Sequence, residues 1–179
     1  MTILTCSLLQ NINTVAAGAV AGDTIKLAGG VHTLAPILIE YSTHAQGTSG
    51  AGVITITSAD DEQATISYNG WVAGNKAYQV CLWDMSYWII DNVDIANFTG
   101  QGLMVWAYDY DSTGCQCLNM NIYNQTHNAA FGTKSGVGLH NTIVGGSLAS
   151  TGSPTATLRD FTAQNIAIKI GRASCRERV

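Results

Sequence analysis

The fold of this chain is decided by the stretch Trp88-Ile89-Ile90-Asp91-Asn92-Val93-Asp94-Ile95-Ala96-Asn97, which returns 27 residues later as Cys115 to Asn124. The matched positions are apolar inside each copy and asparagine at its end: Ile90 with Cys117, Val93 with Met120, Ile95 with Ile122, and Asn97 with Asn124. Copies separated by about 20 to 50 residues are typical of stacked repeats. The alternation within each copy predicts two short strands joined by a tight bend.

An asparagine ends each copy, and we expect these asparagines to stack. Leu158 to Asn165 looks like a third copy, although Asn165 follows Asn124 by 41 residues, so the repeat length varies. Neighbouring parallel strands lie about 4.8 Å apart, which lets stacked side-chain amides hydrogen-bond in a ladder. N-glycosylation is the alternative, because Asn97 and Asn124 each begin an Asn-X-Thr acceptor pattern. The ladder explains why the two asparagines share a repeat position.

The sequence before the repeat predicts one short helix and several strands. Residues 8–16 carry apolar side chains at helical spacing, and Ser7 is available as the N-cap. Residues 21–34 read Ala-Gly-Asp-Thr-Ile-Lys-Leu-Ala-Gly-Gly-Val-His-Thr-Leu, which predicts a Gly-Asp turn, a strand, a Gly-Gly turn and a second strand. Further short strands are expected at 53–57, 64–67 and 79–83.

A leading helix, a Gly-Asp-Thr-Ile strand, a glycine turn and another strand resemble the N-terminal cap and first coil of pectate-lyase-like right-handed parallel β-helix proteins. The resemblance covers residues 8–168 and is strongest at 7–34 and 86–124. It implies an all-β solenoid in which the helix covers the open end of the stacked core. It also implies a protein that acts on polysaccharide and is extracellular or at the cell surface, although no export signal is visible in the sequence.

The last ten residues differ in character from the rest of the chain. Residues 170–179 carry three of the four arginines, and their back-translation resembles read-through of a sequencing adapter. We therefore expect residues 1–169 to be the N-terminal part of one β-helix domain, truncated at its C-terminus, and 170–179 to be a non-native tail. A basic C-terminal arm that binds nucleic acid is the alternative.

Charge and hydropathy argue against two classes of partner. Without residues 170–179, five basic and eleven acidic residues remain, and a net charge of −6 does not suit a protein that binds nucleic acid. No apolar run approaches the roughly 18 residues that a membrane-spanning helix needs. We expect neither a nucleic-acid partner nor a membrane span.

The cysteines outside the tail predict core packing. No CxxC pair occurs among Cys6, Cys81, Cys115 and Cys117. Cys115 and Cys117 are two residues apart, which on a strand points both side chains to one face. Buried thiols are therefore expected in place of a metal site or a disulfide.

One segment between the matched copies combines aromatic and acidic residues. Residues 105–112 read Val-Trp-Ala-Tyr-Asp-Tyr-Asp-Ser. Aromatic rings pack on the apolar faces of sugars, and carboxylates accept hydrogen bonds from hydroxyl groups. The residues predicted to contact a glycan are Trp106, Tyr108, Tyr110 and, beyond this segment, His127. The alternative is that Trp106 and one tyrosine cover the edge of the core while the aspartates are solvated.

A metal site and a catalytic pair are the most specific expectations. Asp109 and Asp111 alternate as two oxygen ligands on one side of an extended segment would, which suits calcium. Lys134 and Arg159 are 25 residues apart, about one coil, and resemble the lysine and arginine pair of the alginate lyase and chondroitinase B group. In that group calcium neutralises the uronate and a basic residue removes the C5 proton. Ordinary surface charges are the alternative for Lys134 and Arg159.

Three functions are consistent with the sequence. The favoured one is a lyase that cleaves acidic polysaccharide by β-elimination; the others are a non-catalytic carbohydrate-binding or adhesive β-helix and a phage tailspike-like receptor-binding module. The fold alone does not choose among them. The resemblance also implies more coils than these residues form, so we expect this piece to be inactive by itself. Asp91 and Asp94, a conceivable hydrolase pair, are expected to be structural.

Overall fold

The computed structural model describes residues 1–68, 78–98, 101–107, 109–124, 142–146, 156 and 158–169, and these residues are mainly short β-strands. In chain order the elements are β1 (Ile3–Cys6), α1 (Ile12–Ala16), β2 (Thr24–Leu27), β3 (Gly30–His32), β4 (Ile37–Glu40), η1 (Gly50–Gly52), β5 (Ile54–Ser58), β6 (Ala64–Ile66), β7 (Tyr78–Trp83), β8 (Trp88–Asp91), β9 (Val93–Ala96), β10 (Gln101–Ala107), β11 (Ser112–Thr113), β12 (Gln116–Tyr123), β13 (Thr142–Gly146), β14 (Leu158–Arg159) and β15 (Thr162–Lys169).

The strands form parallel sheets whose order follows the chain. A nine-stranded sheet has the order β1-β2-β5-β8-β12-β9-β6-β3, and β15 pairs with β12. A four-stranded sheet has the order β13-β10-β7-β4, and β11 pairs with β14. The described pairs are parallel, for example β5 with β8 and β7 with β10. The prediction of an all-β chain is confirmed, and the strands expected at 53–57, 64–67 and 79–83 correspond to β5, β6 and β7.

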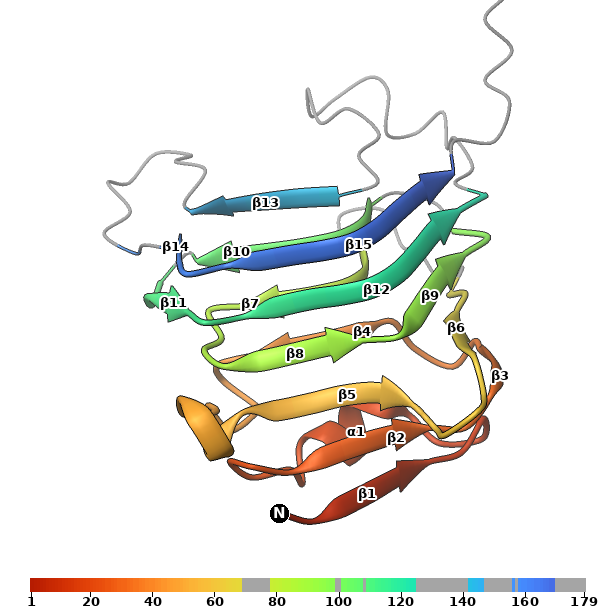
Figure 1. Ribbon diagram of the computed structural model, residues 1–179, viewed down its shortest axis with the longest axis horizontal. Helices are drawn as coiled ribbons and strands as arrows, with labels where there is room; N and C mark the ends of the chain where they lie inside the picture. The colour runs from red at the N-terminus through yellow and green to blue at the C-terminus, as the bar shows by residue number, and fades with distance from the viewer. Residues whose placement is uncertain are drawn as a thin grey trace, which may run out of the picture.

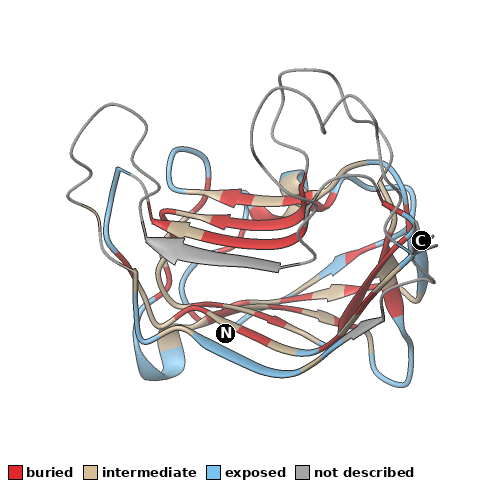
Figure 2. Cartoon of the chain, turned by 90° about the horizontal axis from the view of Figure 1, so that it is seen from above, coloured by how far each residue is buried: buried red, intermediate tan, exposed pale blue. Residues whose placement is uncertain are grey.

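The two larger sheets face each other across a common interior. Figure 1 shows β2, β5, β8, β12 and β15 stacked from the N-terminal end upward, with β4, β7 and β10 stacked behind them. Seen from above, the two sheets lie opposite each other, and buried residues occur along the strands of both (Figure 2). Parallel strands that are close in space but distant in sequence require the chain to cross from one sheet to the other and back.

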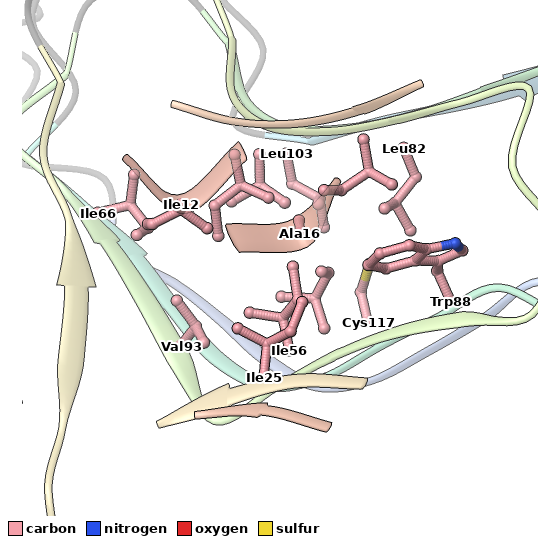
Figure 3. Close-up of a cluster of buried hydrophobic side chains, with 14 of the residues drawn as sticks. Ile12, Ala16, Ile25, Ile56, Ile66, Leu82, Trp88, Val93, Leu103 and Cys117 are labelled. Carbon is pink, nitrogen blue, oxygen red and sulfur yellow. The ribbon is translucent and has the colours of Figure 1, made fainter. Parts of the chain in front are cut away.

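One apolar cluster fills the space between these sheets. Alternate strand residues point inward, as in β4 and β5, where Ile37, Ile39, Ile54 and Ile56 are fully buried. Figure 3 shows side chains from both sheets meeting in this cluster, with Trp88 at one end. Its indole Nε1 donates to the carbonyl oxygen of Ala45 at 2.9 Å, which satisfies the buried polar atom of an otherwise apolar ring.

The predicted N-terminal helix exists but is shorter than the apolar stripe indicated. Asn11, not Ser7, is the N-cap, and its side chain accepts a hydrogen bond from the backbone N–H of Asn13. Ile12 and Ala16 are buried in the core cluster (Figure 3). Leu9 is 89% exposed, because the preceding residues form strand β1 and a turn instead of a first helical turn. The helix expected in this region therefore exists and packs on the core, whereas its predicted start was wrong.

The 27-residue repeat is confirmed by the strand register. Ile90 pairs with Cys117 and Ile95 pairs with Ile122, as the sequence alignment predicted. The amide of Asn124 donates to Oδ1 of Asn97 at 3.1 Å, so these two asparagines form one step of the expected ladder.

The predicted position of Asn165 in that ladder was wrong. The side-chain amide of Asn165 donates to Oδ1 of Asn119 at 2.9 Å, and β15 pairs with β12 at a separation of 46 residues. Asn119 in turn donates to Asp91 at 2.7 Å. The alignment failed because each copy contains two asparagine bends, and Asn165 was matched to the second bend when it belongs to the first.

These bends share a backbone conformation, and two of the three sets of bends share the asparagine side chain as well. Left-handed φ values recur at equivalent positions of successive copies, and they fall into three sets: Tyr87, Gly114 and Asp160 at 55°, 65° and 50°; Asn92, Asn119 and Asn165 at 53°, 52° and 54°; and Asn97 and Asn124 at 50° and 55°. Asparagine is among the few residues with a side chain that adopt this region readily, which explains its recurrence at these bends.

The predicted core thiols are confirmed. Cys6, Cys81, Cys115 and Cys117 are all buried. Cys115 and Cys117 both lie in the main cluster, as their spacing predicted. Burial raises the pKa of the Cys115 thiol to about 11 and raises the pKa of Cys117 as well, so both are neutral thiols at ordinary pH.

Candidate functional site

The outer face of the four-stranded sheet carries a polar and aromatic row at its carboxyl end. In the strand register Glu40 of β4 lies beside Trp83 of β7, and Trp83 lies beside Trp106 of β10. Their neighbours in the strands, Ile39 and Leu82, belong to the inner core. Because side chains alternate between the two faces of a strand, this row points away from the core.

A second, smaller apolar cluster lies beside this row on the same sheet and includes its tryptophans. It consists of the buried residues Tyr78, Cys81 and Met104, with Leu38, Trp83 and Trp106 packed against it. Burial raises the pKa of the Tyr78 hydroxyl, so it stays protonated at ordinary pH. The two tryptophans therefore pack against buried side chains, and this packing helps to hold the orientation of their rings.

The chain continues from each strand end in the same stacked order. The backbone N–H of Tyr41 donates to the carbonyl oxygen of Trp83 at 3.2 Å, and that of Asp84 donates to the carbonyl oxygen of Trp106 at 2.7 Å. Asp84 has a left-handed φ of 55° and is buried. Its Oδ2 accepts a hydrogen bond of 3.1 Å from the backbone N–H of Asp109, which joins the segment after β10 to the turn after β7.

These segments enclose an open cleft of about 450 Å³. Its lining is aromatic and acidic, and consists of Glu40, Tyr41, Ser42, Trp83, Asp84, Asp109 and Tyr110. Residues from the ends of β4, β7 and β10 therefore meet in one place although the sequence separates them by as many as 70 positions. Clefts with apolar surfaces and a few fixed polar groups are the usual sites of ligand binding.

Two pairs of stacked aromatic rings lie at this cleft. The rings of Tyr41 and Tyr110 lie 4.1 Å apart with an interplanar angle of 21°. Both tyrosines are about half exposed, at 47% and 51%. The rings of Trp83 and Trp106 lie 5.4 Å apart at 19°, and Trp83 is the member that lines the cleft. Exposed rings held against one another offer flat apolar faces to a ligand.

The loop that follows β4 is fixed to the turn that follows β7. The side chain of Gln46 makes two of the hydrogen bonds that join them. Its Nε2 donates to the carbonyl oxygen of Asp84 at 3.0 Å, and its Oε1 accepts a hydrogen bond from the backbone N–H of Ser86. The backbone N–H of Gly47 donates to the carbonyl oxygen of Ser86 at 3.0 Å. Gln46 is thus a positioning residue for one wall of the cleft.

His44 lies in the same loop and is buried. Its Nδ1 is 2.8 Å from the hydroxyl oxygen of Thr43, and its ring meets that of Trp88 edge to face at 6.2 Å. Burial lowers its pKa, so the neutral imidazole is favoured. His44 packs the loop onto the core and does not line the cleft.

The structure brings together several of the residues predicted from the sequence. Asp109 and Tyr110 line the cleft, and Trp106 stacks behind Trp83. Asp111 is exposed and does not line it. Arg159 is exposed on β14, where it pairs with Thr113 of β11, and it is not among the lining residues. Three predicted residues, Tyr108, His127 and Lys134, lie outside the described residues.

The calcium ligands remain a prediction. Within the part of the chain that the structure describes, no group of three or more His, Cys, Asp or Glu side chains is close enough to hold a metal ion. Asp109 and Asp111 would have to be joined by further oxygen ligands, because calcium takes six to eight. Asp91 and Asp94 are structural, as expected: Asp91 accepts from Asn119, and Asp94 accepts from the backbone and side chain of Asn121 at 3.0 and 2.9 Å.

Sequence reasoning missed most of the acidic lining. Two of the missed residues, Glu40 and Trp83, end strands β4 and β7, and the other two, Tyr41 and Asp84, directly follow them. The register of these strands with β10 was not predicted. The sequence did carry a signal for this row of residues. The apolar strands Ile37–Glu40 and Tyr78–Trp83 each end in a large polar or aromatic residue, as the Val105-Trp106 stretch does. An alignment of strand ends would have placed Glu40, Trp83 and Trp106 side by side.

No family model, curated protein or solved structure matches the chain. The assignment of a function therefore depends on the site itself. Among the described residues, no helix has the length and apolar character to cross a membrane.

Proposed function

We propose that this chain is part of a parallel β-helix that binds a glycan in the cleft between Tyr41, Trp83 and Tyr110. The observation that carries the proposal is the pairing of exposed, stacked rings with carboxylates in one open cleft. A sugar ring offers apolar C–H faces to aromatic rings and hydroxyl groups to carboxylates, so this lining matches both parts of a sugar. An open cleft also suits a segment of a longer polymer.

The β-helix part of the proposal is supported by the order of the strands. Successive strands β2, β5, β8, β12 and β15 stack in one sheet, and β4, β7, β10 and β13 stack in the other. The chain visits the sheets alternately, as winding around a common core requires. The asparagine ladder and the N-terminal helix over the core support the same interpretation. In line with the resemblance, we place such a protein outside the cell or on its surface.

Glycan binding is favoured over β-elimination by the composition of the cleft. A lyase needs a basic residue at the reacting carbon, and the lining residues that the structure describes are acidic, aromatic or serine. The lyase hypothesis with Lys134 and Arg159 stays a prediction that the same experiment tests. A tailspike-like receptor-binding module would use the cleft in the same way and would differ in being trimeric.

The test is a binding titration of the full chain against a panel of soluble neutral, amine-bearing and uronate oligosaccharides. We expect Tyr110→Ala and Trp83→Ala each to weaken binding about fivefold, because a ring contact contributes on the order of 1 kcal/mol and 1.4 kcal/mol corresponds to a factor of ten. Tyr123→Ala, which removes a ring outside the cleft, is the matched control and should leave affinity unchanged.

Two outcomes would contradict the proposal. Binding that is equal in Tyr110→Ala, Trp83→Ala and the unmodified chain would place the glycan elsewhere. Absorbance from unsaturated products on an acidic polymer, lost in Lys134→Ala or Arg159→Ala, would establish the lyase instead.

A further inference from the structure

The charge of the cleft narrows the class of glycan that it can accept. Three of the described lining residues, Glu40, Asp84 and Asp109, carry carboxyl groups. No described lining residue is a lysine, arginine or histidine. Lys26, the cation that forms an ion pair among the described residues, binds Asp60 on the opposite sheet. The described lining therefore carries carboxyl groups and no cationic side chain.

The position of these carboxylates is fixed by the backbone. Asp84 is 3% exposed, its N–H donates to Trp106, and its carboxylate accepts from Asp109 N–H. Gln46 holds the carbonyl of the same residue. Glu40 ends β4 in register with Trp83. Asp84 is thus a buried carboxylate held in one position, and such a group interacts more strongly with a ligand charge than a solvated carboxylate does, whereas Glu40 is half-buried and Asp109 is exposed.

We infer that the cleft selects glycan units with a protonated amine and rejects uronate units; this inference rests on the proposed glycan site and names its substrate class. An ammonium group can donate charge-assisted hydrogen bonds to the carboxylates of Glu40 and Asp109 and be attracted to the exposed faces of Tyr41 and Tyr110. A uronate carboxylate meets like charge in the same place, which is how a binding site discriminates against the wrong ligand. An N-acetylated sugar keeps the ring contacts and loses the charge.

The experiment compares three length-matched oligosaccharides by calorimetry with the full chain: a β-linked glucosamine oligomer, its N-acetylated counterpart and an oligogalacturonate. Each is titrated at mildly acidic pH, with chelator and separately with calcium. We expect the glucosamine oligomer to bind about tenfold more tightly than the N-acetylated one, and its affinity to fall with added salt. No uronate binding is expected in either buffer.

Conservative variants test the assigned carboxylates. Glu40→Gln and Asp109→Asn should each lower the affinity for the glucosamine oligomer several-fold and lower that for the N-acetylated oligomer less, because only the first loses the charge interaction. Asp61→Asn removes an exposed carboxylate outside the cleft at a bend that asparagine tolerates, and it should change neither affinity. Thermal unfolding of each variant verifies that the fold is intact.

The outcomes separate this inference from the proposed function. Equal affinity for the amine and N-acetylated oligomers, or tighter binding of the uronate with or without calcium, would overturn the inference and leave a glycan site. Binding of none of the three would overturn both. Calcium-dependent uronate binding would in addition restore the metal site predicted at Asp109 and Asp111.

Discussion

Asp23 explains at the residue scale why a Gly-Asp turn opens the first strand. Its Oδ1 accepts the backbone N–H of Thr2 at 2.7 Å, and its Oδ2 accepts that of Val20 at 3.1 Å. One carboxylate thus fastens the chain before β1 and the chain after α1 to the start of β2. These backbone hydrogen bonds lower its pKa below the ordinary 3.8, because they favour the charged form.

Asp23→Asn is expected to lower the melting temperature by several degrees at neutral pH, because the amide replaces one accepting oxygen with a donor. A carboxylate with a lowered pKa stabilises the fold above its ordinary pKa, and this stabilisation is lost as the pH falls through the pKa of the folded state. The difference between Asp23→Asn and the unmodified chain should therefore shrink as the pH falls below 3.8 in thermal melts. A difference that stays constant down to acidic pH would refute this assignment.

Gly114 occupies a bend that a side chain would disturb in two ways. Its φ is 65°, and a Cβ atom there would lie 2.6 Å from the Cδ1 and Cε1 atoms of Tyr87. Gly114→Ala is expected to lower the free energy of unfolding by about 2 to 3 kcal/mol, from about 1–2 kcal/mol of backbone strain plus the displacement of the ring.

Gly50→Ala is the matched control, because Gly50 has a φ of 69° and no atom within 4 Å of the added Cβ. Denaturant unfolding should show a loss of about 1 kcal/mol for Gly50→Ala, so the excess in Gly114→Ala measures the contact with Tyr87. Equal losses in the two variants would mean that the ring moves aside at no cost.

The bends are the elements that keep successive copies in register. A parallel strand that slips by two residues keeps its apolar side chains inward, so alternation alone does not define the register. A left-handed residue with an asparagine side chain at one position does define it, since Asn119 must lie over Asp91 and under Asn165. The ladder is therefore a device for alignment as well as a source of hydrogen bonds.

Asn119→Ala should lower the free energy of unfolding by about 2 kcal/mol, because alanine loses both ladder hydrogen bonds and is strained at a φ of 52°. Asn119→Gly loses the same hydrogen bonds without that strain, and a loss of about 1 kcal/mol is expected in chemical denaturation. If the glycine variant were as unstable as the alanine variant, hydrogen bonding and not backbone strain would dominate at this bend.

The sequence predicted elements well where one local rule governed them. Alternation and the 27-residue spacing placed β8, β9 and β12, because each copy carries the same apolar positions. The start of α1 was not predictable from the stripe alone, since Leu8 and Leu9 have helical spacing but belong to the segment that pairs and turns before Asn11. Pairing of β1 with β2 is a tertiary interaction, and it overrides local helical preference.

At the scale of the whole molecule, the cleft shows what sequence reasoning could not reach. Trp106, Asp109 and Tyr110 were found because they are adjacent in one segment. Glu40 and Trp83 were missed because only the register of β4, β7 and β10 brings them together. Contacts that depend on the length of every intervening turn are not specified by any local pattern.

The buried thiols report on the stability of the whole stack. In a Cys175→Ser background, Cys6, Cys81, Cys115 and Cys117 are expected to react with a thiol reagent at least about a hundredfold more slowly in the native state than in denaturant, because they are buried. Mass spectrometry should show modification of Cys6 before Cys117. Cys6 lies on β1, at the end of the sheet order, whereas Cys117 lies on β12 between β8 and β15. Simultaneous modification of all four would indicate that the sheets open only as one unit.

Paired residues are 27 positions apart between β8 and β12 and 46 positions apart between β12 and β15. This difference has a consequence for how such a chain can evolve or be engineered. Register and bends are preserved across both intervals, so the added sequence is accommodated without altering the paired strands. One strand register is thus compatible with unequal lengths of intervening chain, so a foreign peptide or a small domain inserted between two paired strands would be displayed without a change in their pairing.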